Sequence, residues 1–140
     1  EQAELEGKYK FPKGFKKSLE VYNLNHCMES PALEEMQNKG LIIVEGVFDV
    51  LRFIKAGIKN VVALMGTAIS KVQLEKLKAV SNKFYIFADN DYAGQMLTSK
   101  MLTLLSDTHV DCFRYQNSFK TRKSPEDFSL TELRNITANL

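Results

Sequence analysis

Short apolar runs alternate along this chain with segments whose apolar residues recur at helical spacing, and this alternation restricts the possible folds more than any other feature. The runs are LIIVE at 41–45, VVAL at 61–64 and FYIFA at 84–88. Because they are almost wholly apolar, they predict strands buried on both faces, which is typical of parallel sheets. A fourth run, HVDCFRY at 109–115, alternates like a strand nearer an edge. The sequence therefore predicts an α/β fold with a central parallel sheet of about four strands, helices on both faces and right-handed crossovers.

Helix boundaries between these runs are marked by capping signals. In SPALEEMQNKG, residues 30–40, we expect Ser30 to cap a helix, Pro31 to take its first position and Glu34 to complete a capping box. Two later capping boxes are predicted from Ser70 with Gln73 and from Ser129 with Glu132. The helix predicted after Gly46 is marked by apolar residues at helical spacing, which are Val47, Val50, Leu51 and Ile54.

Composition and length fit one soluble domain. The 140 residues, 44% of them hydrophobic and 26% charged, allow a sizeable core. The chain has neither an apolar run that could span a bilayer nor the apolar block of a signal peptide, so we expect a cytoplasmic protein without a membrane partner. The net charge of +2 is too small to identify a nucleic-acid binder. The two cysteines and two histidines form no ligand cluster, which argues against a zinc site.

The segment 1–39 differs from the regular part of the chain, residues 40–140. It mixes lysines with aromatic residues, and its Gly and Pro residues predict a loop-rich structure before Lys16. The lysines that are candidates for contacting a nucleic-acid backbone are Lys10, Lys13, Lys16 and Lys17. Lysines on a loop are equally compatible with simple solvation, so both interpretations stay open.

Carboxylates follow two of the predicted strands. Glu45 ends the first, and Asp89 and Asp91 follow the third. If these strands are neighbours where the strand order reverses, their carboxylates converge at one edge of the sheet, with Asp49 one helical turn away. Carboxylates so close together repel each other unless a cation lies between them. The alternatives are that Asp89 only caps the next helix, and that Asp49 is a solvated residue paired with Arg52.

This pattern resembles the Toprim domain of primases, topoisomerases and several nucleases. The marks are the strand-terminal Glu45-Gly46 and the later Asp89-Asn90-Asp91. Within that superfamily, VEGVFDVLRFIKAGIKNVVALMGTAIS and DNDYAG look most like the versions in DnaG-type bacterial and phage primases. The upstream FPKGFKKSLEVYNL resembles the end of the primase subdomain that precedes Toprim, which suggests that segment 1–39 belongs to that subdomain and residues 40–140 to Toprim.

The resemblance implies a site for Mg²⁺, with Mn²⁺ as a possible substitute. It assigns catalytic roles to Glu45, Asp89 and Asp91, and it implies metal ligation by Glu45, Asp49, Asp89, Asp91, Glu126 and Asp127. Where these primases carry Asp-Pro-Asp, this chain has KSPEDF, with Ser124 in the first aspartate position and Glu126 in the second. A serine hydroxyl is a poorer ligand than a carboxylate, so either one metal position is weaker or Asp127 replaces it.

Phosphate contacts are predicted around the same sheet edge. Gly46 and Gly94 permit a close backbone approach, and the backbone of Gly66 and Thr67 could meet an anion, although any tight turn could use the last pair. The basic residues near KSPEDF could contact phosphate or balance the neighbouring carboxylates, and they are Lys120, Arg122 and Lys123.

As a function, the resemblance implies the Toprim catalytic part of a DNA primase. Such an enzyme makes short RNA primers on a single-stranded DNA template from ribonucleoside triphosphates, and a replicative helicase is a possible partner. A stand-alone Toprim nuclease and a non-catalytic metal- or nucleotide-binding module remain alternatives. A topoisomerase is disfavoured, since no tyrosine lies in a recognisable nucleophile context.

Overall fold

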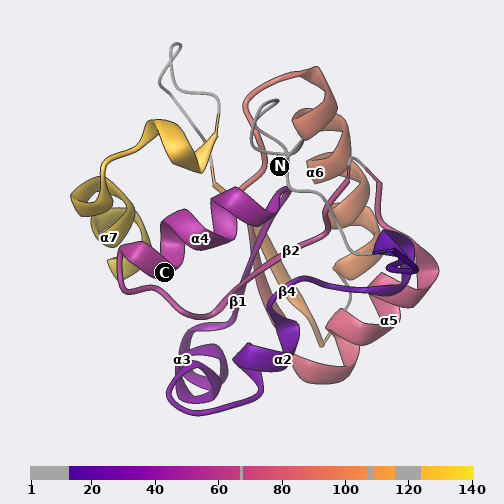
Figure 1. The fold of residues 1–140 in the computed structure, drawn as a ribbon, viewed down its shortest axis with the longest axis horizontal. Coiled ribbons are helices and arrows are strands. Elements are labelled where there is room, and N and C mark those ends of the chain that lie inside the picture. Colours follow the sequence, from indigo (N-terminus) through magenta and orange to yellow (C-terminus); the bar gives the residue numbers. More distant parts are fainter. Residues whose placement is uncertain (1–12, 67, 107–108, 116–123) are drawn as a thin grey trace.

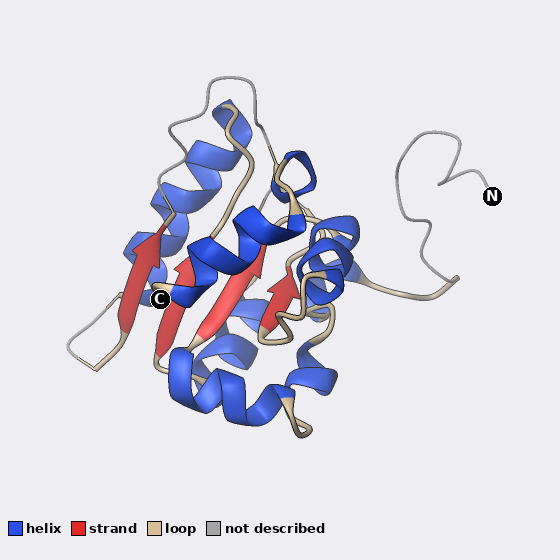
Figure 2. Cartoon of the chain, turned by 90° about the vertical axis from the view of Figure 1, so that its left-hand side faces the viewer, coloured by secondary structure: helices blue, strands red, loops and turns tan. Residues whose placement is uncertain are grey.

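The centre of the molecule is a four-stranded sheet in which every pair of neighbouring strands is parallel. A computed structural model describes residues 13–66, 68–106, 109–115 and 124–140. The strands are β1 (Leu41–Val44), β2 (Val61–Ala63), β3 (Lys83–Ile86) and β4 (Asp111–Arg114), in the order β2-β1-β3-β4. Figure 2 shows their arrowheads at the same edge of the sheet. The predicted α/β fold with a parallel sheet is confirmed, and so is the edge position of the strand predicted at 109–115.

Helices cover both faces of this sheet (Figure 1). They are η1 (Lys17–Leu19), α2 (Leu24–Cys27), α3 (Ala32–Lys39), α4 (Val47–Lys55), α5 (Lys71–Val80), α6 (Tyr92–Leu105), η2 (Pro125–Asp127) and α7 (Leu130–Ala138). Helices α4 and α7 lie on one side of the sheet, and α5 and α6 lie on the other. No helix in the described part of the chain is both long and apolar enough to cross a membrane.

Each face of the sheet has its own apolar core, because successive strand residues point to opposite faces. Ile43 and Phe84 pack with residues of α5 and α6, and the same cluster includes Cys27 and Met36 from the segment before β1. On the opposite face, Ile42 packs in a cluster with residues of α4 and α7. Burial on both sides explains why β1 is apolar at every position.

The segment before β1 is attached to the sheet by polar contacts as well. Tyr22 forms an antiparallel bridge with Ala63 of β2, with both backbone hydrogen bonds present. The buried amide of Gln73 donates to the carbonyl oxygens of Lys17, Glu20 and Leu64. These contacts hold the described part of the segment against β2 and α5, whereas the division at residue 39 stays a prediction.

The capping predictions are confirmed for two helices and wrong for one. Ser70 and Gln73 exchange both hydrogen bonds of a capping box before α5, and Ser129 and Glu132 do the same before α7. At α3 the N-cap residue is Pro31, and the helix begins at Ala32. The Ser30 hydroxyl donates to the Glu34 carboxylate at 2.8 Å, so Ser30 is bonded to a side chain and does not cap the backbone.

The apolar residues whose helical spacing predicted α4 are only partly buried. Val47 and Val50 are buried, but Leu51 and Ile54 are 44% and 38% exposed. Phe53, which the spacing did not select, is completely buried and packs edge-on against Phe87 with 5.5 Å between ring centroids. The helix is therefore rotated so that Phe53 rather than Leu51 reaches the sheet.

Candidate metal centre

The carboxyl ends of the two central strands bring Glu45 and Asp89 together. Strands β1 and β3 are parallel neighbours, with Ile43 in register with Ile86. The backbone N–H of Asp89 donates a hydrogen bond to the Glu45 carboxylate. Because β2 lies on the outer side of β1 and β3 on its inner side, this is where the strand order reverses. The predicted convergence of these two residues is confirmed.

Asp49 is directed back toward the same sheet edge by the first turn of α4. Its carboxylate accepts a hydrogen bond from the backbone N–H of Gly46 at 3.2 Å, and the residue is only 6% exposed. The alternative of a solvated residue paired with Arg52 is wrong. Arg52 instead donates to the carbonyl oxygen of Phe128, with distances of 3.2 Å from Nε and 2.7 Å from Nη2.

The two aspartates after β3 have different environments. Asp91 is exposed and caps α6, because its Oδ1 accepts from the backbone N–H of Gly94 at 2.7 Å. Asp89 does not cap the helix. Its Oδ1 is buried without a hydrogen-bond partner among the described residues, although a buried carboxylate oxygen normally has one. The capping interpretation therefore applies to Asp91 and not to Asp89.

Burial and mutual repulsion make these carboxylates hard to ionise. Burial raises the pKa of Asp89 to about 7, with further increases from the charges of Glu45, Asp49, Asp91 and Glu126. Burial likewise raises the pKa of Asp49 to about 7. The pKa of Glu45 is raised mainly by burial, against the lowering effect of its hydrogen bond from Asp89. A nearby cation would relieve this repulsion and favour the ionised forms.

The short helix η2 places a further carboxylate near this group. Repulsion from Glu126 is the largest charge effect on the pKa of Asp49, ahead of Glu45 and Asp127, and Glu126 also raises the pKa of Asp89. The carboxylate of Asp127 accepts from the backbone N–H of Ser124 at 3.1 Å and so caps η2. Glu126 therefore repels the Asp49 carboxylate more strongly than Asp127 does, and it also repels Asp89.

These side chains fit a partly hydrated divalent cation rather than a closed protein cage. Among the described residues, no three His, Cys, Asp or Glu side chains are arranged so that they could enclose a metal ion. Mg²⁺ commonly binds through one or two carboxylates and keeps water or substrate phosphate as its other ligands. The buried, unpartnered Oδ1 of Asp89 is a ligand atom of the required type, and Glu45, Asp49 and Glu126 supply further negative charge around it.

The predicted phosphate-binding glycines have different surroundings. A Cβ on Gly94 would lie 1.9 Å from the carbonyl oxygen of Asp89, so tight packing of α6 against the chain after β3 already requires glycine there. The N–H of Gly46 is bonded to Asp49. Gly66 is exposed with open space around it, and Thr67 lies outside the described residues. Phosphate binding by these four residues stays a prediction.

The candidate nucleic-acid contacts are only partly described. Lys13, Lys16 and Lys17 are exposed on the segment before η1 and within it. The other four predicted positions, Lys10, Lys120, Arg122 and Lys123, lie outside the described residues.

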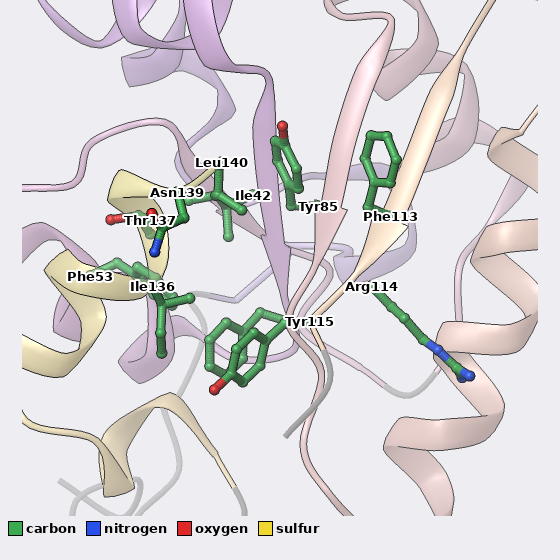
Figure 3. A pocket seen from close by; sticks show the side chains of 11 residues that line it. Ile42, Phe53, Tyr85, Phe113, Arg114, Tyr115, Ile136, Thr137, Asn139 and Leu140 are labelled. Atoms are coloured by element: carbon green, nitrogen blue, oxygen red, sulfur yellow. The ribbon is translucent and has the colours of Figure 1, made fainter. Parts of the chain in front are cut away.

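The structure also has an apolar cavity of about 490 Å³ (Figure 3). It opens on the face of the sheet that carries α7, and its lining includes Tyr85, Phe113, Tyr115 and Ile136. None of its lining residues is acidic, so it does not extend the carboxylate group.

Sequence reasoning missed Arg52 as a positioning residue. Its bond to Phe128 crosses 76 residues of sequence and holds η2, and therefore Glu126, against α4. No signal within the sequence around Arg52 identifies a backbone carbonyl so far along the chain as its partner.

Comparison with known proteins agrees with this geometry. Residues 42–129 match the Toprim-like family. The DNA primase of Lactococcus lactis is 31% identical over 119 residues, covering 85% of this chain and 18% of the primase. The DNA primase of Aquifex aeolicus is 36% identical over 100 residues, covering 71% of this chain and 19% of that primase. The chain thus spans about a fifth of the length of these relatives.

Solved structures show the same likeness. The crystal structure of the Aquifex aeolicus primase, comprising its zinc-binding and RNA polymerase domains, has a TM-score of 0.68 and 30% identity over 93% of this chain and 32% of that one. A DnaG primase catalytic domain bound to single-stranded DNA has a TM-score of 0.62 at 22% identity, over 92% of this chain and 40% of that one, and shares the fold. The family match includes the Glu-Gly pair, the Asp-x-Asp pair and η2 within one continuous region. This chain therefore belongs to the Toprim-like family and is similar to the DNA primases within it.

Proposed function

We propose that this chain is the catalytic Toprim part of a DNA primase and carries out metal-dependent nucleotidyl transfer. The observation that supports this most directly is the buried Oδ1 of Asp89, which has no hydrogen-bond partner in the described chain and lies among other carboxylates. A protein that had no use for a cation there would gain stability by replacing Asp89 with a neutral residue.

The residues divide into distinct roles. Asp89 and Asp49 are the proposed ligands of Mg²⁺ or Mn²⁺, with Glu126 beside them and Asp91 and Asp127 at the rim. When bound, the cation would reduce the charge on the attacked phosphoryl group and favour ionisation of the attacking 3′ hydroxyl. Glu45 is held by the Asp89 N–H and has a raised pKa, so it is placed either to complete the ligand set or to accept a proton.

The substrates and partners belong to the same proposal. The named relatives are DNA primases, and the chain spans about a fifth of their length. We propose a single-stranded DNA template and ribonucleoside triphosphates as substrates, with a replicative helicase as a partner of the longer protein and the cytoplasm as its location. The proposed contacts with the template backbone are the predicted lysines of segment 1–39, of which Lys13, Lys16 and Lys17 are exposed, together with the predicted basic residues after β4.

The test is an incorporation assay with the 140-residue chain and a labelled single-stranded DNA template. Primase chemistry predicts that labelled ribonucleotides are incorporated with Mg²⁺ or Mn²⁺, and that Asp89→Asn abolishes this. Asp111→Asn is the matched control, since Asp111 is exposed at the start of β4. Degradation of the DNA without added nucleotides would instead identify a nuclease. Metal binding without either reaction would identify a binding module.

A further inference from the structure

A second, polar cavity of about 380 Å³ lies beside the candidate metal centre. One wall is formed by Asp89 and Asn90 after β3, another by Gln95, Thr98 and Ser99 of α6, and the side toward β4 includes Arg114. Its volume lies within the range of roughly 300–1,000 Å³ that is usual for small-molecule sites. Unlike the cavity in Figure 3, it shares a residue, Asp89, with the carboxylate group.

Arg114 is directed to this side of the sheet by the strand register. It pairs with Ile86 of β3, and residues paired in register point to the same face. Ile86 belongs to the core under α5 and α6, whereas the neighbouring pair Tyr85 and Phe113 points to the opposite face. Arg114 and Tyr115 line the apolar cavity as well, but Figure 3 shows the Arg114 side chain extending away from the aromatic residues of that cavity, on the side of α6.

The guanidinium of Arg114 is available for a ligand. It is exposed, and it forms no hydrogen bond or ion pair with any other residue that the structure describes. The cavity thus has an anionic wall at Asp89 and a cationic group at Arg114. The Gln95 amide and the Ser99 hydroxyl of α6 lie on the same lining and could donate further hydrogen bonds, whereas the Thr98 hydroxyl already donates to the carbonyl oxygen of Gly94.

We propose that this cavity binds the polyphosphate chain of the nucleoside triphosphate substrate, with Arg114 contacting a phosphate on the side away from Asp89. An arginine fork matches phosphate oxygens in a bidentate geometry, and a cation at Asp89 would neutralise the nearer end of the chain. This inference rests on the proposed metal centre and adds a residue that binds the substrate without binding the metal.

The test compares Arg114→Met with Lys100→Met by calorimetry in saturating Mg²⁺. Lys100 is an exposed cation of α6 that does not line the cavity. Three ligands are titrated: inorganic tripolyphosphate, ATP and a short single-stranded DNA. We expect Arg114→Met to weaken tripolyphosphate and ATP binding about tenfold or more, as the loss of a charged hydrogen bond does, while DNA binding stays unchanged. Lys100→Met should leave all three affinities unchanged.

A second pair of variants tests the wall of the cavity that α6 forms. Ser99→Asp introduces a negative charge into the cavity and should also weaken ATP binding, whereas Thr103→Asp places the same charge one turn along α6 outside it. Unchanged ATP affinity in Arg114→Met overturns the proposal, and so does a loss confined to DNA, which would identify backbone phosphate as the ligand. Mg²⁺ titrated alone separates the two hypotheses: if the wild type binds no Mg²⁺, the metal centre itself fails.

Discussion

At the scale of single residues, Asp89 is the group whose position is hardest to explain by folding alone. One carboxylate oxygen is buried without a partner in the described chain, and the surrounding carboxylates repel it. The same sequence motif contains Asp91, which has an ordinary structural role as the cap of α6. Two aspartates one residue apart therefore differ in what their substitution should do.

We predict that Asp89→Asn stabilises the metal-free protein and removes its response to Mg²⁺. At about pH 8 the amide eliminates charge repulsion, and a gain of roughly 1–2 kcal/mol would raise the melting temperature by about 3–6 °C. Thermal unfolding followed by circular dichroism, in EDTA and in Mg²⁺, measures both effects. Asp111→Asn should change neither. A less stable Asp89→Asn protein that still responds to Mg²⁺ would show that Asp89 has only a structural role.

We also predict that the stability of the metal-free protein depends on pH through Asp49 and Asp89. Both have a pKa of about 7 in the folded chain and about 3.8 in model compounds. The folded state therefore holds protons that the unfolded state has released, so the free energy of unfolding should fall as pH rises from about 4 to about 7. Mg²⁺ competes with these protons for the carboxylates. The rise in the protein's melting temperature on adding Mg²⁺ should therefore be larger at about pH 8 than at about pH 6. An equal rise in melting temperature at the two pH values would contradict competition between Mg²⁺ and protons.

At the scale of secondary-structure elements, α6 and η2 are positioned by contacts that bear directly on the site. Gly94 lets α6 pack against the backbone of Asp89, and Arg52 of α4 holds the carbonyl oxygen of Phe128 at the end of η2. Neither contact involves a proposed metal ligand through its side chain. Both determine where such ligands lie.

Replacing Gly94 with alanine should disrupt the site through packing. The new Cβ would lie 1.9 Å from the Asp89 carbonyl oxygen, and overpacking of this kind costs about 2–3 kcal/mol of unfolding free energy. Gly66→Ala is the matched control, because nothing lies within 4 Å of a Cβ there. Urea denaturation measures the difference. Equal stability of the two variants would mean that α6 can shift without cost.

Removing the hydrogen bonds from Arg52 to the carbonyl oxygen of Phe128 should weaken metal binding indirectly. In Arg52→Met the carbonyl oxygen of Phe128 loses its two hydrogen bonds from Arg52, so η2 is held less firmly against α4 and Glu126 less firmly near Asp49, although the buried Phe128 ring still packs in the core. We expect Mg²⁺ affinity to fall about threefold to tenfold, with faster amide exchange in residues 124–133. Arg134→Met is a useful comparison, since Arg134 bonds Ala56 instead. Unchanged amide exchange in η2 would argue against a role of Arg52 in holding η2 in place.

At the scale of the whole molecule, the parallel character of the sheet could be predicted from the sequence, whereas the strand order β2-β1-β3-β4 could not. Strands buried on both faces must be apolar throughout, and the crossover rule leaves few ways to connect them. The convergence of Glu45 and Asp89 was predicted on the condition that their strands are neighbours, and the observed order meets that condition. The family match over residues 42–129 agrees with the resulting fold.

Other features depend on contacts between distant residues, which local patterns do not contain. Phe53 of α4 is buried against the aromatic ring of Phe87, which follows β3. The hydrogen bond from Arg52 to Phe128 and the position of Arg114 in the same cavity as Asp89 arise only once the sheet is assembled. Helical spacing alone could not distinguish Phe53 from Leu51 as the buried residue.

The proposed metal centre is tested most directly by titrating Mg²⁺ into the wild-type chain and into Asp89→Asn by calorimetry, with Asp111→Asn as the control. We predict saturable binding in the wild type and in Asp111→Asn, and its loss in Asp89→Asn, because the buried Oδ1 of Asp89 is a ligand atom that forms no hydrogen bond with any described residue. Equal binding in all three proteins, or none in the wild type, would contradict a metal centre at this edge of the sheet.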